Sequence, residues 1–184
     1  MKNLKNYVIA VLIGFGSFGI FGRSYGQDDA KFTFGIDEKG AYIGAKMSMK
    51  DMIRLHPLAK DTIVGDKHLY NISLPFPKED SISVYYSLSL NKDNTIDELA
   101  CTAETPKYGD TTKFFFKDKG LDGEIDYYSI IINNFELMKL ESPNEIKNSE
   151  KEGYDYQSIS SFYNKLLDVL IKSYADHLQS QLKK

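Results

Sequence analysis

Hydrophobic and polar residues alternate most regularly between Ser81 and Leu90. One set of positions is apolar and is expected to face a core: Ile82, Val84, Tyr86, Leu88 and Leu90. The other set is dominated by serine and is expected to face water: Ser81, Ser83, Tyr85, Ser87 and Ser89. This run of alternations predicts a strand with one buried and one solvated face, which is typical of an antiparallel sheet.

Further strands are predicted on both sides of this segment. Apolar residues alternate at the start of the run from Phe32 to Ile43 and resume after the turn sequence 37–40, which indicates a hairpin. A strand is expected over 69–74, and later apolar runs lie at 95–104, 111–117, 125–133 and 135–141. The connections are too short for helical crossovers, so the sequence predicts a meander of four or five antiparallel strands.

A short helix is predicted before this meander and a long one after it. Ser48 and Asp51 resemble a capping box, so a helix should begin there and end near Leu55. Residues 142–156 are interpreted as a polar linker. The predicted fold class is α+β: an antiparallel β-meander sheet with a long C-terminal helix packed on its apolar face and a short N-terminal helix.

The long helix is expected over about 156–182, with Asp155 or Ser158 as its cap. Apolar residues recur there at helical spacing and mark one face of the helix. These residues are Ile159, Phe162, Tyr163, Leu166, Leu167, Leu170, Tyr174, His177, Leu178 and Leu182.

Residues 1–26 have the three regions of a cleaved secretory signal peptide. Lys2 and Lys5 precede an apolar run over 7–21, and Ser24 and Gly26 provide the small residues before the cut. The run is shorter than the roughly 20 residues of a membrane-spanning helix, so no membrane span is expected after cleavage. The chain is therefore predicted to be exported, to the periplasm or outside the cell, as one domain over 27–184.

Charge and cysteine content narrow the class of protein. Without the signal peptide, 20 basic residues remain against 26 acidic ones, a net charge of about −6. With no basic patch beyond the last two lysines, nucleic acid is excluded as an expected partner. Cys101 is the single cysteine, so an internal disulfide is excluded. Its strand spacing from Leu99 and Ala103 predicts a buried, inert thiol.

The bend over 118–126 is the candidate metal site. Asp118, Asp122 and Asp126 recur every fourth residue around Gly120 and Gly123. Compared with a twelve-residue calcium loop, the sequence lacks the acidic residue at the third position and the glutamate at the twelfth. Three readings stay open: a solvated hairpin turn with three exposed aspartates, a weak calcium site, or an acidic catalytic cluster.

The solvated side of the alternating strand is the candidate binding surface. Ser81, Ser83, Ser87 and Ser89 surround Tyr85, and this serine and tyrosine mixture is typical of binding surfaces. The alternative is an ordinary solvent face of a central strand.

Catalytic motifs are missing from the sequence, which favours a protein that is not an enzyme. It carries no Gly-x-Ser-x-Gly, P-loop or His-Glu-x-x-His motif, and no histidine pair has helical zinc spacing. The leading hypothesis is an exported binding domain that recognises a protein or an envelope glycan, with an immunity or inhibitor role as one version. The alternative is a small envelope hydrolase or a calcium-dependent domain that uses the aspartate bend. No cofactor is predicted beyond this weak calcium.

Overall fold

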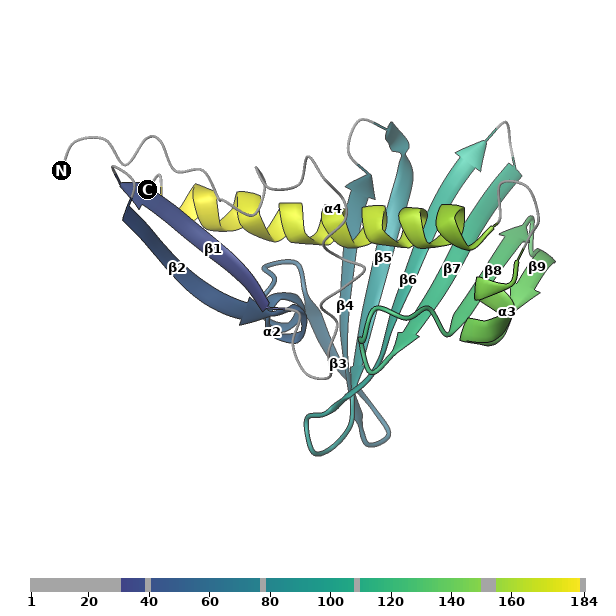
Figure 1. The fold of residues 1–184 in the computed structure, drawn as a ribbon, viewed down its shortest axis with the longest axis horizontal. Coiled ribbons are helices and arrows are strands. Elements are labelled where there is room, and N and C mark those ends of the chain that lie inside the picture. The colour runs from purple at the N-terminus through teal and green to yellow at the C-terminus, as the bar shows by residue number, and fades with distance from the viewer. Residues whose placement is uncertain (1–30, 39–40, 77–78, 108–109, 150–154, 183–184) are drawn as a thin grey trace.

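The computed structural model describes residues 31–38, 41–76, 79–107, 110–149 and 155–182, and its fold class is α+β (Figure 1). Seven antiparallel strands form one sheet in which each strand pairs with the next strand of the chain. These strands are β3 (Lys60–Val64), β4 (Lys67–Phe76), β5 (Glu79–Leu90), β6 (Ile96–Lys107), β7 (Asp110–Lys119), β8 (Tyr127–Ile132) and β9 (Phe135–Leu140). The predicted meander is confirmed, but it is larger than the four or five strands expected.

The main strand that the sequence pattern failed to predict is β3, at the edge of the sheet. All five of its residues are exposed, so they carry no alternation of buried and solvated positions. An edge strand has one neighbour and can pair with it without a buried face of its own. The register of β3 with β4 runs from the Lys60 and Asn71 pair to the Val64 and Lys67 pair.

The N-terminal hairpin forms a separate two-stranded sheet of β1 (Lys31–Glu38) and β2 (Ala41–Ser48). Its register pairs Phe34 with Ala45, in agreement with the predicted hairpin. Residues 39–40 of the expected turn and the predicted signal peptide over 1–26 lie outside the described residues.

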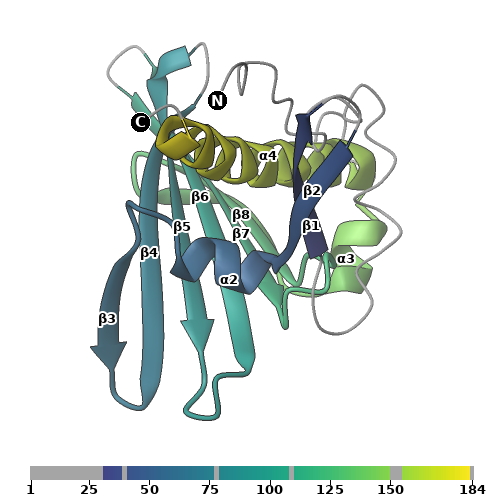
Figure 2. The ribbon, with the colours of Figure 1, turned by 90° about the vertical axis from the view of Figure 1, so that its left-hand side faces the viewer.

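The short helix α2 (Met49–Arg54) has the predicted cap. Ser48 Oγ accepts a hydrogen bond from the Asp51 amide at 3.0 Å, and the helix ends at Leu55. Its apolar side chains Met49, Met52 and Ile53 are fully buried, so the helix closes one end of the core. Figure 2 shows α2 beside the sheet and below α4.

The long helix α4 (Tyr156–Leu182) crosses the apolar face of the sheet (Figure 1). Asp155 is its cap, because the Asp155 carboxylate accepts from the Ser158 amide at 3.0 Å. Most of the described side chains of the predicted face are buried, Phe162 and His177 are half-buried, and the buried Val169 and Ile171 widen the face. Tyr86 on β5 donates a hydrogen bond to the Leu166 carbonyl, which joins sheet and helix.

Part of the expected polar linker is a helix, α3 (Pro143–Lys147). Ser142 caps it by accepting from the Glu145 amide at 3.3 Å, and Ile146 is completely buried. One buried residue in a polar run was too weak a signal to predict a helix. Among the described residues, no helix combines the length and hydropathy that a membrane span requires.

Candidate functional site

The sheet face opposite α4, here called the outer face, presents two rows of side chains across the strands. The alternation places the odd positions of β5 on this face, because Val84, Tyr86 and Leu88 are buried on the other. Cross-strand pairing then aligns a first row: Lys60, Asn71, Ser87 and Ala100. The second row is Ser73, Tyr85, Thr102 and Phe115.

A hollow of about 500 Å³ lies over these two rows. Its described lining comes from the loop before β3, the first residue of β3, and β4, β5, β6 and β7: Leu58, Lys60, Asn71, Ile72, Ser73, Tyr85, Tyr86, Ser87, Ala100, Thr102 and Phe115. Ala100 is the smallest side chain in the first row, and this leaves room between its larger neighbours. The hollow falls in the size range of small-molecule sites. We call it the outer-face hollow.

Two aromatic side chains of the second row flank Thr102 in the outer-face hollow. Tyr85 and Phe115 are both register partners of Thr102, one on each side of β6. Two strand spacings therefore separate their backbones, roughly 10 Å in all. Tyr85 is 44% exposed, and the ring of Phe115 packs edge-on against Tyr127 with ring centroids 5.6 Å apart. The small side chain of Thr102 thus lies between the two rings, and we call this part of the hollow the aromatic slot.

Lysines on the outer face differ in whether an acidic side chain neutralises them. Lys113 lies 3.4 Å from Glu104, and Lys117 lies 3.2 Å from Glu98. Lys60, at the rim of the hollow, has no such ion pair among the described residues. None of the described lining residues is acidic. The hollow is therefore locally positive on a chain that is acidic overall.

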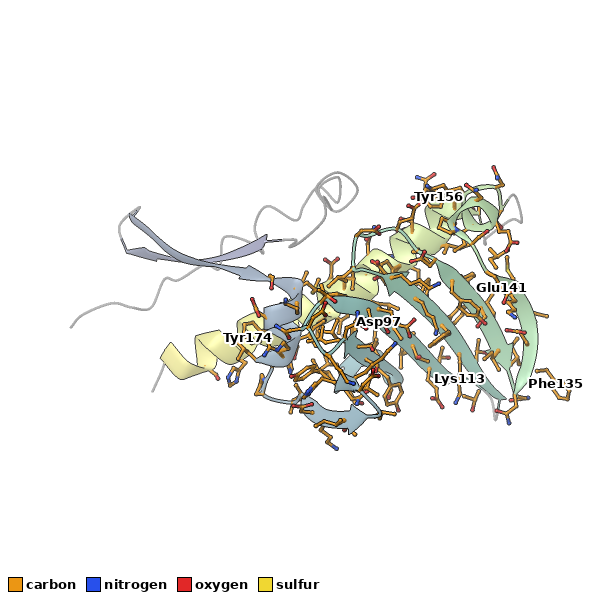
Figure 3. All side chains as sticks on the ribbon, turned by 90° about the horizontal axis from the view of Figure 1, so that it is seen from below. Asp97, Lys113, Phe135, Glu141, Tyr156 and Tyr174 are labelled. Atoms are coloured by element: carbon orange, nitrogen blue, oxygen red, sulfur yellow. The ribbon has the colours of Figure 1, made fainter. Side chains whose placement is uncertain are left out.

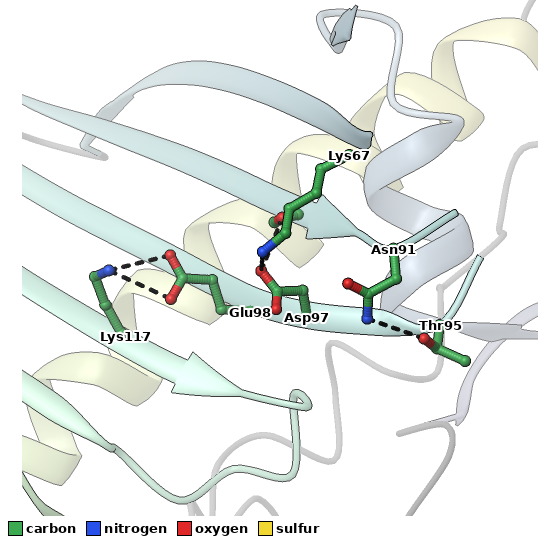
Figure 4. A network of polar contacts seen from close by, with 7 residues as sticks. Lys67, Asn91, Thr95, Asp97, Glu98 and Lys117 are labelled. Carbon is green, nitrogen blue, oxygen red and sulfur yellow. Dashed lines mark hydrogen bonds and ion pairs between the residues drawn. The ribbon is translucent and has the colours of Figure 1, made fainter. Parts of the chain in front are cut away.

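Ser89 is not available to a partner, in contrast to its predicted place on the binding surface. It is buried, and its hydroxyl donates a hydrogen bond to Asp97 Oδ2 at 3.0 Å. The Lys67 ammonium donates to the same oxygen at 2.7 Å. The register shifts between Ser89 and Leu90, which makes Asp97 an extra residue on β6 and turns it toward this contact. Figure 4 shows the resulting network at one end of the outer face.

Two of the five predicted surface residues, Tyr85 and Ser87, line the outer-face hollow. Ser83 is half-buried and lies outside the described lining, and the side chain of Ser81 lies outside the described residues. Three further lining residues were not predicted from the sequence: Asn71, Thr102 and Phe115, which come from three other strands. Only the strand register, which the sequence pattern does not specify, brings them beside Tyr85.

The aspartate bend is organised by a buried side chain, so the prediction of three exposed aspartates is wrong. Asp118 is 0% exposed because β7 turns it to the face that α4 covers. Its carboxylate accepts hydrogen bonds from the amides of Asp122 and Gly123, each at 3.0 Å, and from the Tyr163 hydroxyl at 3.0 Å. Leu121 lies between Asp118 and Asp122 in the chain and has a φ of 56°, in the left-handed region, so the backbone wraps tightly around the Asp118 carboxylate.

The other two aspartates of the bend bind backbone amides of their own. Asp122 accepts from the Glu124 amide at 2.8 Å, and Asp126 accepts from the Lys119 amide at 2.6 Å. Over the described part of the chain, no three acidic, histidine or cysteine side chains lie close enough together to hold a metal ion. The structure therefore lends the calcium hypothesis no support.

Burial sets the protonation of the groups under α4. The pKa of Asp118 is raised to about 7, mainly by desolvation; the neighbouring Asp122 also raises it, while the hydrogen bond from Tyr163 opposes the rise. Cys101 is fully buried, and desolvation together with Asp118 raises the pKa of its thiol well above the ordinary value. The predicted burial of Cys101 is confirmed, and a thiol held in its neutral form is a poor nucleophile.

His56 is a structural histidine at the junction of α2 and α4. The Leu58 amide donates to its Nδ1 at 3.2 Å, so Nε2 carries the proton and donates to Ser173 Oγ, also at 3.2 Å. Burial, together with a smaller effect of His177, lowers the pKa of His56 to about 4. Both nitrogens are used in internal hydrogen bonds, which leaves this side chain no role in ligand binding.

The far edge of the sheet exposes two large apolar residues. Phe135 is 80% exposed and Leu137 is 60% exposed on β9, and Figure 3 shows Phe135 projecting from the sheet edge. Neither lines the outer-face hollow. These positions provide controls for experiments on the hollow.

Comparison with known proteins gives no match to a protein-family model, to a curated protein or to a solved structure. What the outer-face hollow can do is therefore inferred from its own side chains. On the outer face its lining combines the rings of Tyr85 and Phe115 with hydroxyl groups, one amide and one ammonium. Such groups bind and orient a ligand by stacking, hydrogen bonding and charge attraction.

Proposed function

We propose that this protein is an exported binding domain, acting in the periplasm or outside the cell, that recognises a protein or envelope glycan through the outer face of its sheet. The observation that carries the proposal is the outer-face hollow, which contains Tyr85 and Ser87 of the predicted binding surface. A hollow lined by aromatic side chains and a few polar groups is the usual form of a binding site.

The alternative, an envelope hydrolase or calcium-dependent domain built on the aspartate bend, has weaker support. The carboxylate of Asp118 is buried and receives three hydrogen bonds from the protein itself. A catalytic carboxylate must reach its substrate, and a calcium ligand must direct its oxygen atoms at the ion. If the partner is a protein, an immunity or inhibitor role is one form that the proposed binding function would take.

Co-sedimentation of the purified protein with envelope fragments of a Gram-negative bacterium tests the proposal. Tyr85→Arg places a bulky charge in the hollow at a position that is 44% exposed, so we expect binding to fall at least tenfold while the fold persists. Leu137→Arg introduces the same charge at an exposed position outside the hollow and should bind like the wild type. Equal binding by all three proteins would contradict the proposal.

A further inference from the structure

We propose that the outer-face hollow takes a short glycan that carries a carboxylate, an acidic sugar unit of one or two rings. This inference rests on the proposed function and names the ligand class of the same site. The hollow combines an aromatic slot, a row of hydrogen-bonding side chains and one lysine without an acidic partner among the described residues.

The aromatic slot suits a sugar ring. A pyranose presents C–H groups on its faces and hydroxyl groups around its rim, so it packs on aromatic rings and hydrogen-bonds at its edges. Tyr85 and Phe115 stand on either side of Thr102, about 10 Å apart at the backbone by strand spacing. A volume of about 500 Å³ is enough for one or two such rings.

The first row supplies hydrogen bonds and charge in the direction of the sheet edge. Asn71 offers both a donor and an acceptor, and Ser87 beside it offers a hydroxyl. Lys60 lies next to Asn71 at the end of the row, with no ion pair among the described residues. Because the described lining holds one cation and no acid, a ligand with one negative group is favoured over a polyanion.

Other ligand classes fit the hollow less well. An extended peptide that joins a sheet pairs with an edge strand, whereas the hollow lies mainly over strands whose backbone groups are already paired on both sides. A divalent cation requires carboxylates, which the described lining lacks. A purely apolar ligand would leave the polar groups of the lining without partners.

A matched pair of disaccharides tests the inference by calorimetric titration of the purified protein. The acidic probe is N-acetylglucosamine joined to N-acetylmuramic acid, and the neutral probe is two joined N-acetylglucosamine units, which lack the carboxylate. We expect the acidic probe to bind about fivefold more tightly at low salt, the upper range for an exposed ion pair. Lys60→Met should abolish this difference, and Tyr85→Ala should weaken both probes about tenfold or more.

The outcomes separate this inference from the proposed function. If neither disaccharide binds, while envelope fragments still bind and Tyr85→Arg prevents it, the glycan inference is overturned and the binding function stands. If both disaccharides bind equally to the wild type, the acidic part of the inference is overturned. If envelope fragments do not bind either, the proposed function itself fails. Thermal unfolding of Lys60→Met, an exposed position, verifies that the variant is folded.

Discussion

The hydroxyl of Tyr163, on α4, donates a hydrogen bond to the carboxylate of Asp118, on β7, at 3.0 Å inside the core. The two residues are 45 positions apart in the chain. Their bond ties the long helix to the strand that enters the aspartate bend. A carboxylate at this depth needs hydrogen bonds to offset its desolvation, and Tyr163 supplies the one that comes from a side chain.

Replacing Tyr163 by Phe should therefore destabilise the protein through Asp118. The loss of a hydrogen bond to a charged group costs about 1.5–3 kcal/mol, and the cost should be larger at pH 8 than at pH 5, because Asp118 is ionised at pH 8. Urea unfolding of the wild type and of Tyr163→Phe at the two pH values measures this loss of unfolding free energy. Tyr127→Phe is the control, because the Tyr127 hydroxyl bonds to Glu136 at an exposed site. A cost equal to that control would contradict the role of Tyr163.

Asp118 should also make stability fall as pH rises. Its pKa is about 7 in the folded protein, against an ordinary value of 3.8, so the folded state binds more protons between these values. The contribution is present below about pH 4 and is lost as pH rises through 7. His56 acts in the opposite sense, because its pKa is lowered to about 4.

Comparison with Asp118→Asn isolates this contribution from that of other groups. We subtract the free energy of unfolding of the variant from that of the wild type. This difference should be larger at pH 5 than at pH 8 by at least about 1.4 kcal/mol, which corresponds to one pKa unit. Urea unfolding across this pH range provides the measurement. A difference that stays constant, or grows with pH, would show that the pKa of Asp118 is not raised in the folded state.

Calcium should have no effect on the stability of the protein, because the oxygen atoms of Asp118 already accept internal hydrogen bonds. The test is thermal unfolding in EDTA and in about 10 mM Ca²⁺. A site with a Kd near 0.1 mM would add about 2.7 kcal/mol to the free energy of unfolding. A calcium-dependent shift that disappears in Asp122→Asn would establish the metal site instead.

Ser129→Ala should leave stability unchanged or raise it by up to about 1 kcal/mol. Ser129 is 1% exposed, and its hydroxyl has no hydrogen-bond partner among the residues that the structure describes. A buried hydroxyl without a partner keeps its desolvation cost, which alanine removes. Ser83→Ala, at a half-buried position of β5, is the control and should change stability by less than about 0.5 kcal/mol. A loss above 1 kcal/mol for Ser129→Ala would mean that this hydroxyl is hydrogen-bonded in solution.

The fold class was predictable because its signals are local. The alternation around Val84 and Tyr86 identifies β5 and its buried face, and the helical spacing from Ile159 to Tyr174 identifies α4. Each pattern comes from residues within one element, where the period of the backbone decides which side chains share a face. The edge strand β3 has no buried side, so the same reasoning could not find it.

The site was less predictable because it depends on contacts between distant elements. Asp118 is one of three similar aspartates in the sequence, and its place on β7, two residues after the buried Phe116, together with its contact with Tyr163 on α4, distinguishes it as buried. Phe115 and Tyr85 lie on either side of Thr102 only because of the register of β5, β6 and β7. Register is set by the whole sheet and its turns, so a single strand does not reveal it.

The most direct test of the proposed binding face is to map the contact with a soluble digest of bacterial envelope. Amide chemical shifts of the labelled protein would be followed as the digest is added. We predict that the largest changes lie on the outer face, at the amides of Asn71, Ser87, Ala100 and Thr102. Changes confined to the aspartate bend over 118–126 or to β9, or no changes at all, would contradict the account.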